Sequence, residues 1–283
     1  MSSAALTFRD LTLGYSSHPA VHHLGGKVER GSLTAVVGAN GSGKSTLLKG
    51  IVGLLRPMAG VCVAAKDLKI AYLPQMSELD RTFPARVVDL VSLGLWPRRG
   101  LLGRFTSNDR EAVRTAISAV GLEGFEKRPL DTLSGGQLQR ALFARVLVQD
   151  ADLILLDEPF NAIDAKTVTD LVALIGRWHG EKRTVMVVVH DLELVRQHFP
   201  ETLLLARQPV GWGPTAEVLT AQNLMRARRF DEAWHDDAPW CDPQGHEHFG
   251  GDVHDHGHAH DHVHEHDRGH GHDHPHDDRP PAA

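Results

Sequence analysis

A glycine-rich segment carries the clearest chemical signal in the sequence. It fits the pattern G-x-x-x-x-G-K-[ST] and stands between an apolar run, residues 33–37, and a helix-like stretch, residues 47–51. Glycines let the backbone turn tightly and aim its N–H groups at an anion, and the following helix presents the positive end of its dipole there. The pattern predicts a loop for the phosphates of a nucleotide, made of Gly38, Asn40, Gly41, Ser42, Gly43, Lys44, Ser45 and Thr46.

Two side chains of this loop have separate predicted tasks. Lys44 would reach the β- and γ-phosphates, and the Ser45 hydroxyl would ligate Mg²⁺. A glycine-rich turn before an ordinary helix is the alternative. The order of strand, loop, Lys-Ser pair and helix favours the phosphate loop.

An acidic pair follows a second apolar run. Leu153 to Leu156 reads as a strand buried on both faces, and Asp157 and Glu158 come directly after it. Asp157 is placed to hold Mg²⁺, and Glu158 to orient or deprotonate a water that attacks the γ-phosphate. A solvated strand end would explain the pair as well, if the phosphate loop were absent.

A histidine ends a third apolar run. Residues 184–189 read as another buried strand, and His190 follows it. An imidazole there could hydrogen-bond the γ-phosphate and the attacking water. A structural histidine is the alternative.

A second anion site is predicted far along the chain. Leu133-Ser134-Gly135-Gly136-Gln137 opens an apolar helix, so a serine hydroxyl and two glycine N–H groups stand at a helix N-terminus. One chain does not need two γ-phosphate sites. A dimer does, if the second site of each subunit covers the nucleotide of the other.

The elements that must position these residues form a parallel sheet. The segment between the two apolar strands reads as a helix with Asp164 as its N-cap and Val168, Leu171, Val172, Ile175 and Trp178 on its apolar face. Strand, helix and strand in this order imply parallel neighbours, whose ligands bind beyond the carboxyl ends. We therefore expect Gly38, Asp157 and His190 to meet at one edge.

Other segments have different patterns. Residues 5–37 read as short strands, with turns at Gly25-Gly26 and Arg30-Gly31, and Tyr15 at a strand end could stack on an adenine or merely cover a sheet edge. Residues 76–150 read as an inserted helical subdomain. Its two predicted apolar faces are Val87, Leu90, Val91 and Leu95, and Val113, Ala116, Ile117 and Val120.

Composition excludes several classes of protein. Of 283 residues, 41% are hydrophobic, which is ample for a core, but no apolar run approaches the roughly 20 residues of a membrane span. The first residues lack the basic and apolar regions of a signal peptide, and two distant cysteines predict neither a disulfide framework nor a thiol-only metal site.

The net charge is −6, and the residues from 246 onward hold nine acidic residues against two arginines. The rest is nearly neutral, which argues against nucleic-acid binding.

These motifs resemble, in order and spacing, those of ATP-binding cassette (ABC) transporter ATPases. The resemblance covers residues 5–228, and the Leu-Ser-Gly-Gly-Gln element makes it very specific. It implies a P-loop α/β ATPase core with a parallel sheet, an antiparallel β subdomain and an inserted helical subdomain. It also implies that two chains sandwich two ATP molecules head to tail.

The resemblance also implies roles for individual residues. Lys44, Ser45 and Thr46 would bind phosphates and Mg²⁺, Gln75 would contact Mg²⁺ and the attacking water, and Asp157 would serve Mg²⁺. Glu158 would be the base, His190 would hold the γ-phosphate and Asp164 would link the two sites. The γ-phosphate would be bound from across the dimer by Ser134, Gly135, Gly136 and Gln137. Tyr15 would stack on the adenine.

One motif departs from the common form. Many family members read S-x-L-D where this chain has Asn161-Ala162-Ile163-Asp164. The aspartate is kept, so we expect catalysis to survive. The Asn form resembles that of ATPases serving zinc and manganese importers.

The end of the chain predicts metal binding. We expect an ATPase domain over residues 1–234 and a flexible tail over residues 235–283, disordered without metal. Imidazoles beside carboxylates suit Zn²⁺, Ni²⁺ or Cu²⁺ better than Mn²⁺. A solubilising acidic tail is the alternative. The candidate ligands are His254, His256, His258, His260, His262, His264, His266, His270, His272 and His274.

Together these features predict the ATP-hydrolysing subunit of an importer for a divalent transition metal, zinc first, with ATP and Mg²⁺ as cofactors and Zn²⁺ on the tail. The expected partners are a second copy, a membrane permease and an extracytoplasmic metal-binding protein. The expected location is the cytoplasmic face of the inner membrane, as a peripheral protein. Alternatives are an importer of nickel or a chelated metal, a soluble ABC ATPase outside transport, and a metal-storage protein.

Overall fold

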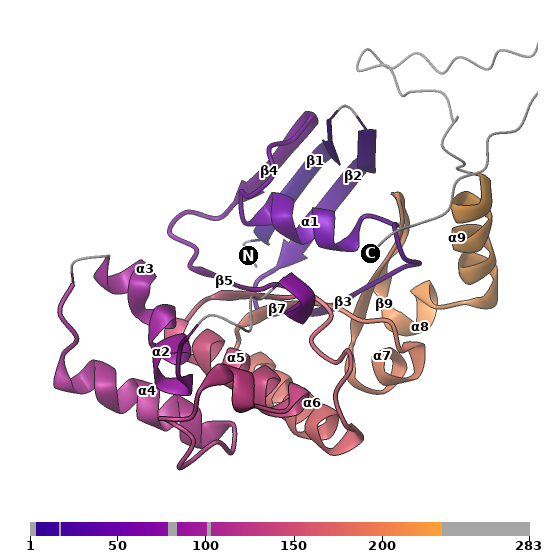
Figure 1. Cartoon of the computed structure of the whole chain (residues 1–283). Helices are drawn as coiled ribbons and strands as arrows, with labels where there is room; N and C mark the ends of the chain where they lie inside the picture. The colour runs from indigo at the N-terminus through magenta and orange to yellow at the C-terminus, as the bar shows by residue number, and fades with distance from the viewer. Residues whose placement is uncertain (1–3, 17, 79–83, 101–102, 234–283) are drawn as a thin grey trace, which may run out of the picture. The chain divides into compact units, whose positions relative to one another are not determined.

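The structure is a computed structural model that describes residues 4–16, 18–78, 84–100 and 103–233 (Figure 1). The chain divides into two units, Met1–Trp240 and Cys241–Ala283, and every described residue belongs to the first. The predicted histidine ligands, residues 254–274, lie outside the described residues.

A six-stranded sheet forms the centre of the first unit. Its order is β5-β6-β7-β3-β8-β9, and all neighbours are parallel except β8 and β9. The predicted parallel sheet is therefore confirmed. The strands are β3 (Leu33–Val37), β5 (Ile70–Leu73), β6 (Leu153–Leu156), β7 (Thr184–Val188), β8 (Glu201–Ala206) and β9 (Gln208–Pro214).

An antiparallel sheet and one helix cover one face of the parallel sheet (Figure 1). The antiparallel sheet has the order β2-β1-β4 and consists of β1 (Ala4–Tyr15), β2 (His18–Glu29) and β4 (Ala59–Ala64). Helix α1 (Lys44–Ile51) buries Leu47 and Leu48 in the cluster that also holds Val36, Leu155 and Met186 of the parallel sheet. The alternate strand residues, such as Ile154 and Val187, face a second cluster with the remaining helices. Because both faces are covered, these strands are apolar throughout rather than alternating.

The helical insertion joins two strands that pair with each other, β5 and β6. It contains η1 (Met76–Glu78), α2 (Val87–Ser92), η2 (Leu93–Leu95), α3 (Trp96–Arg99), α4 (Ser107–Ala119), η3 (Leu130–Thr132) and α5 (Gly135–Gln149). Both predicted apolar faces are buried, and α2 and α4 pack against α5. The helical prediction for this region is confirmed.

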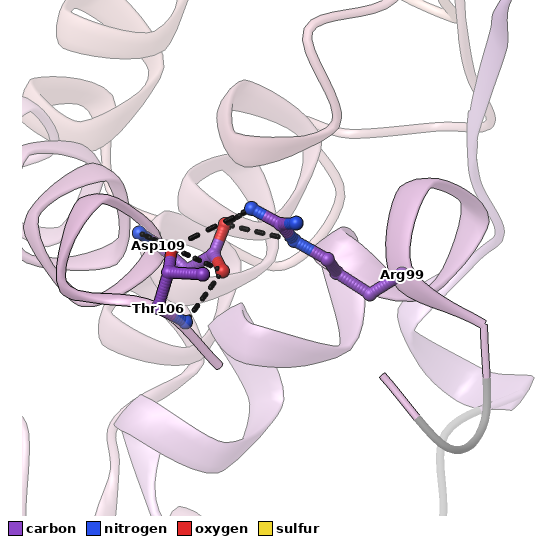
Figure 2. Close-up of polar contacts among 3 residues, drawn as sticks. All are labelled: Arg99, Thr106 and Asp109. Carbon is purple, nitrogen blue, oxygen red and sulfur yellow. Dashed lines mark hydrogen bonds and ion pairs between the residues drawn. The ribbon is translucent and has the colours of Figure 1, made fainter. Parts of the chain in front are cut away.

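A buried carboxylate fixes the start of α4 (Figure 2). Asp109, 3% exposed, accepts hydrogen bonds from Arg99 Nη2 at 2.7 Å and from Thr106 N and Oγ1, both at 2.8 Å. The Arg99 guanidinium and Thr106 hold the pKa of Asp109 at about 2, well below its usual range. The contact ties the end of α3 to the first turn of α4.

The remaining helices complete the second cluster. They are α6 (Ala165–Gly180), α7 (Leu192–His198), α8 (Thr215–Val218) and α9 (Ala221–Ala233). The Asp164 carboxylate accepts a hydrogen bond from Thr167 N at 2.9 Å, so the predicted N-cap of α6 is confirmed. Helix α6 buries Leu174 fully, whereas the predicted core positions Val168 and Val172 are only half-buried. No helix among the described residues has the length and apolarity of a membrane span.

The predicted turn at Gly25-Gly26 is wrong, because both residues lie within β2. The hairpin between β1 and β2 instead turns between Tyr15 and His18. The Trp212 ring of β9 packs on Gly26, where a Cβ atom would lie 2.7 Å from the ring. Gly26 therefore serves close packing rather than chain reversal. The other predicted turn is present, since Ser32 N donates to Glu29 O across Arg30-Gly31.

Candidate functional site

The carboxyl ends of three neighbouring strands bring the predicted residues together. β6, β7 and β3 are adjacent and parallel, so the segments that follow them emerge at one edge. Gly38 follows β3, Asp157 follows β6, and His190 follows β7 after one residue. The predicted convergence of these three segments is present.

The phosphate loop is shaped by glycines that no other residue could replace without displacement. A Cβ atom at Gly38 would lie 2.1 Å from Leu205 O, and one at Gly43 would lie 2.3 Å from Ala20 O. Gly41 and Gly43 have φ angles of 83° and 96°, in the left-handed region that favours glycine. Ser42 Oγ is buried and has no hydrogen-bond partner among the described residues. The glycines thus give the loop a preformed, concave backbone, as an anion site requires.

Helix α1 begins at Lys44 and directs its first N–H groups at this loop. Its N-cap, Gly43, has no side chain that could cap them, and N–H groups at a helix N-terminus favour an anion. Lys44 is 4% exposed, and its ammonium donates to Gly38 O at 3.0 Å and Ala39 O at 2.7 Å. A cation is therefore held over the loop backbone.

Oxygen-bearing side chains meet beside Ser45. Ser45 Oγ donates to Asp157 Oδ1 at 3.0 Å, and Gln75 Nε2 donates to Ser45 Oγ at 3.3 Å. Tyr72 in β5 donates its hydroxyl to Asp157 Oδ2 at 3.4 Å. Asp157 is buried. Carboxylate, hydroxyl and amide oxygens are the ligands that Mg²⁺ prefers, so Ser45, Gln75 and Asp157 fit this ion.

The next carboxylate points to different partners. His190 Nε2 lies 2.7 Å from Glu158 Oε1, and Asn161 Nδ2 donates to Glu158 Oε2. Glu158 has a φ angle of 49°, an uncommon conformation for a residue with a side chain. The backbone therefore reverses direction here and separates the carboxylate of Glu158 from that of Asp157.

Part of these groups, together with the phosphate loop, lines one pocket of about 490 Å³. Glu158 and Gln75 line it together with the loop, and the full lining is Ala20, Asn40, Gly41, Gly43, Lys44, Ser45, Thr46, Gln75 and Glu158. The pocket combines backbone N–H groups, a cation, oxygen ligands and a carboxylate. This arrangement can bind a phosphate chain with Mg²⁺ and can activate a water next to it.

The predicted second anion site lies elsewhere. Ser134 Oγ accepts from Gln137 N at 3.2 Å, and Gln137 Oε1 accepts from Ser134 N at 3.0 Å, so the two residues cap α5. A Cβ atom at Gly136 would lie 3.1 Å from Asp164 Oδ2, which places the start of α5 beside the Asn161–Asp164 segment. The four residues Ser134 to Gln137 do not belong to the described lining of the 490 Å³ pocket.

Other predicted residues are also absent from this lining: Gly38, Ser42, Asp157 and His190, which adjoin residues that line it or contact them, and Tyr15 and Asp164. Tyr15 ends β1 as predicted and is 50% exposed. Asp164 caps α6, and hydrogen bonds from the Thr167 N–H and hydroxyl hold its pKa below the usual range. It therefore stays ionised at neutral pH.

Sequence reasoning missed two contacts of the acidic pair. Tyr72 reads as an ordinary residue of a short strand, and only the pairing of β5 with β6 brings its hydroxyl to Asp157. Asn161 stands out in the sequence as a departure from the common motif, but its distance of three residues from Glu158 did not predict a hydrogen bond. The turn between them creates it.

Comparison with known proteins identifies the family. The ABC transporter family profile matches residues 21–161. The manganese transport system ATP-binding protein MntB of Listeria monocytogenes is 39% identical over 228 residues, which cover 78% of this chain and 95% of that protein. The zinc transport system ATP-binding protein TroB of Treponema pallidum is 38% identical over 230 residues, covering 79% and 86%.

Solved structures agree. An ABC transporter described as being of the metal-chelate type, in an inward-facing conformation, has a TM-score of 0.73 and 29% identity, covering 80% of this chain and 90% of that chain. A dimeric bacterial ABC transporter cassette, MJ0796, has a TM-score of 0.65 and 25% identity, covering 74% and 98%. The predicted fold class is confirmed for the described residues. Since sequence and fold agree over most of the length of these relatives, the chain belongs to the family of ABC transporter ATP-binding proteins.

Proposed function

We propose that this chain hydrolyses ATP to power the import of a divalent transition metal through a separate membrane permease. Zinc is the metal that we favour. The pocket in which Lys44, Ser45, Gln75 and Glu158 meet is the observation that carries the ATPase part. The relatives named for manganese and zinc transport support the metal part.

Each residue of the pocket has a task in this reaction. The loop N–H groups and Lys44 bind the β- and γ-phosphates, and Ser45, Asp157 and Gln75 hold Mg²⁺. Mg²⁺ supplies charge neutralisation at the phosphate oxygens. Glu158 accepts the proton of the attacking water, and His190, in contact with Glu158, hydrogen-bonds the γ-phosphate.

The second anion site completes the pocket of a second chain. Ser134, Gly135, Gly136 and Gln137 stand at the N-terminus of α5, outside the pocket lining of their own chain. In a head-to-tail dimer these residues bind the γ-phosphate of the ATP in the partner's phosphate loop. Asp164 links the two ATP sites. Tyr15 stacks on the adenine. The solved cassette MJ0796, 25% identical to this chain, is dimeric, which supports the pairing of two cassettes.

The choice of zinc over manganese rests on the tail sequence. Ten of its histidines, from His254 to His274, alternate with acidic or small residues. Imidazole binds Zn²⁺ well, whereas Mn²⁺ prefers carboxylate, carbonyl and water oxygens. We propose that the tail buffers or senses the imported Zn²⁺ at the cytoplasmic face of the inner membrane. An extracytoplasmic binding protein would deliver the metal to the permease.

An importer of a chelated metal is the second candidate. The structure described as a metal-chelate type ABC transporter, 29% identical to this chain, favours it.

Metal uptake in a deletion strain tests the function. A strain without this gene should lose uptake of ⁶⁵Zn²⁺, regain it with the wild-type gene, and fail to regain it with Lys44→Ala. A strain that loses uptake of ⁵⁴Mn²⁺ or of a chelate, but keeps that of ⁶⁵Zn²⁺, would exclude zinc as the substrate.

Removal of the tail tests its separate role. A chain truncated after residue 245 should keep its basal ATPase activity and lose most of its Zn²⁺ binding in calorimetry. Equal Zn²⁺ binding by the truncated and full chains would contradict a metal-binding tail. A full-length chain with alanine at the ten histidines is the matched control, because it keeps the acidic residues and the length.

A further inference from the structure

We propose that Asn161 is a positioning residue that fixes the carboxylate of the catalytic base, Glu158, at the rim of the phosphate pocket. This proposal rests on the proposed ATPase function. It assigns a specific task to the residue at which this chain departs from the common S-x-L-D motif.

The carboxylate of Glu158 is held at both oxygens by side chains from different segments. Asn161, in the segment before α6, donates its amide N–H to Oε2, and His190, after β7, lies 2.7 Å from Oε1. Glu158 also lines the phosphate pocket, with a side chain 15% exposed. A base must lie within hydrogen-bond reach of its water. The two contacts reduce the number of orientations that the Glu158 carboxylate can adopt, which favours the orientation that reaches the water.

The backbone at Glu158 has an unfavourable conformation that needs stabilising contacts. Glu158 adopts a φ angle of 49°, and a turn closes behind it, with Asn161 N donating to Glu158 O at 3.3 Å. A residue with this φ persists only where its surroundings stabilise it. The Asn161 side chain connects the two ends of the turn a second time. Backbone and side chain together therefore hold the carboxylate toward the pocket.

An asparagine is suited to this task, and its common replacements are not. A serine side chain is one bond shorter than that of asparagine, so its hydroxyl extends less far toward the Glu158 oxygen at the same backbone geometry. An aspartate has the same shape but no N–H donor, and it places a second negative charge beside Glu158. Asn161 is exposed, so its truncation leaves no cavity in the core.

The kinetic test separates positioning from substrate binding. Asn161→Ala should lower kcat for MgATP hydrolysis about tenfold and leave KM nearly unchanged, since the amide touches the base rather than the phosphates. Asn161→Asp should lose at least as much. Asn108→Ala is the matched control, because it removes an exposed asparagine from α4 and should change neither constant.

A double-mutant cycle tests whether Asn161 acts through Glu158. In a Glu158→Gln background, Asn161→Ala should cause no further fall in the residual rate. Binding of a fluorescent ATP analogue with Mg²⁺ and the melting temperature should both match those of the parent proteins. A tenfold additional fall in the Glu158→Gln background, or a raised KM with unchanged kcat, would overturn the proposal.

The two proposals fail in different ways. If the wild-type chain does not hydrolyse MgATP, the proposed function fails. If the wild-type chain hydrolyses MgATP and Asn161→Ala retains the wild-type kcat, only the positioning role of Asn161 fails.

Discussion

At the scale of single residues, two adjacent carboxylates have different contacts. Asp157 is buried and binds Ser45 Oγ through one oxygen and the Tyr72 hydroxyl through the other. Glu158 has a φ angle of 49°, lines the pocket, and lies 2.7 Å from His190 Nε2 through Oε1. The proposed metal ligand, Asp157, and the proposed base, Glu158, therefore occupy successive positions with different contacts.

The Tyr72 hydroxyl should matter for the affinity of Mg²⁺. Tyr72→Phe keeps the ring in the core and removes the hydroxyl that donates to Asp157 Oδ2, so the carboxylate loses one restraint on its orientation. A hydrogen bond to a charged group contributes about 1.5 kcal/mol or more, but this one is long, and we expect the apparent Mg²⁺ affinity to fall about three- to tenfold. Titration of the ATPase activity with Mg²⁺ measures this.

The same variant has a clear control. Binding of ATP without Mg²⁺ should be unchanged, because the hydroxyl donates to Asp157, the residue that we assign to the metal rather than to the phosphates. Unchanged Mg²⁺ dependence in Tyr72→Phe would show that Asp157 is oriented without this hydroxyl.

At the scale of elements, the ion pair between Arg99 and Asp109 joins two helices of the insertion (Figure 2). Asp109 also closes a capping box, since Asp109 N donates to Thr106 Oγ1 at 3.2 Å and the carboxylate accepts from Thr106 N. Burial makes this carboxylate costly to leave unpaired. The contact therefore sets where α4 begins relative to α3.

Asp109→Asn should lower the melting temperature at neutral pH. The Arg99 guanidinium and Thr106 depress the pKa of Asp109 from 3.8 to about 2, so the stabilisation is full above about pH 4 and is lost as the pH falls toward 2. The difference in melting temperature between wild type and Asp109→Asn should shrink over this window. Calorimetry between pH 2 and pH 7 measures it.

Glu111→Gln on the same helix is the matched control. Its pair with Arg114 has a distance of 3.2 Å and more than 60% exposure on both side chains, so its removal should change little. An effect of Glu111→Gln equal to that of Asp109→Asn would contradict a special role for the buried pair.

At the scale of the whole molecule, the sequence predicted what depends on local pattern. The parallel sheet, the helical insertion and the meeting of the segments after β3, β6 and β7 follow from apolar runs and short motifs. The role of Gly26 could not be predicted, because Trp212, which packs on it, is nearly two hundred residues away in sequence. The burial of Leu174 rather than Val168 similarly depends on which side of α6 packs against the rest of the domain.

The separation of the two anion sites also belongs to this scale. The phosphate loop lines one pocket, and the start of α5 stands next to the Asn161–Asp164 segment outside the lining. A single chain that binds one ATP molecule has no need for two sites that bind a γ-phosphate. We propose that they form one composite site when two copies face each other head to tail.

We propose above all that two copies of this chain bind MgATP between them. Glu158→Gln keeps the shape of the base and should stop hydrolysis, so it should hold the closed dimer. Light scattering of this variant with saturating MgATP should give about twice the mass of one chain, and Lys44→Ala/Glu158→Gln should remain monomeric because the loop lysine is missing. A Glu158→Gln chain that remains monomeric with MgATP at high protein concentration would contradict the account.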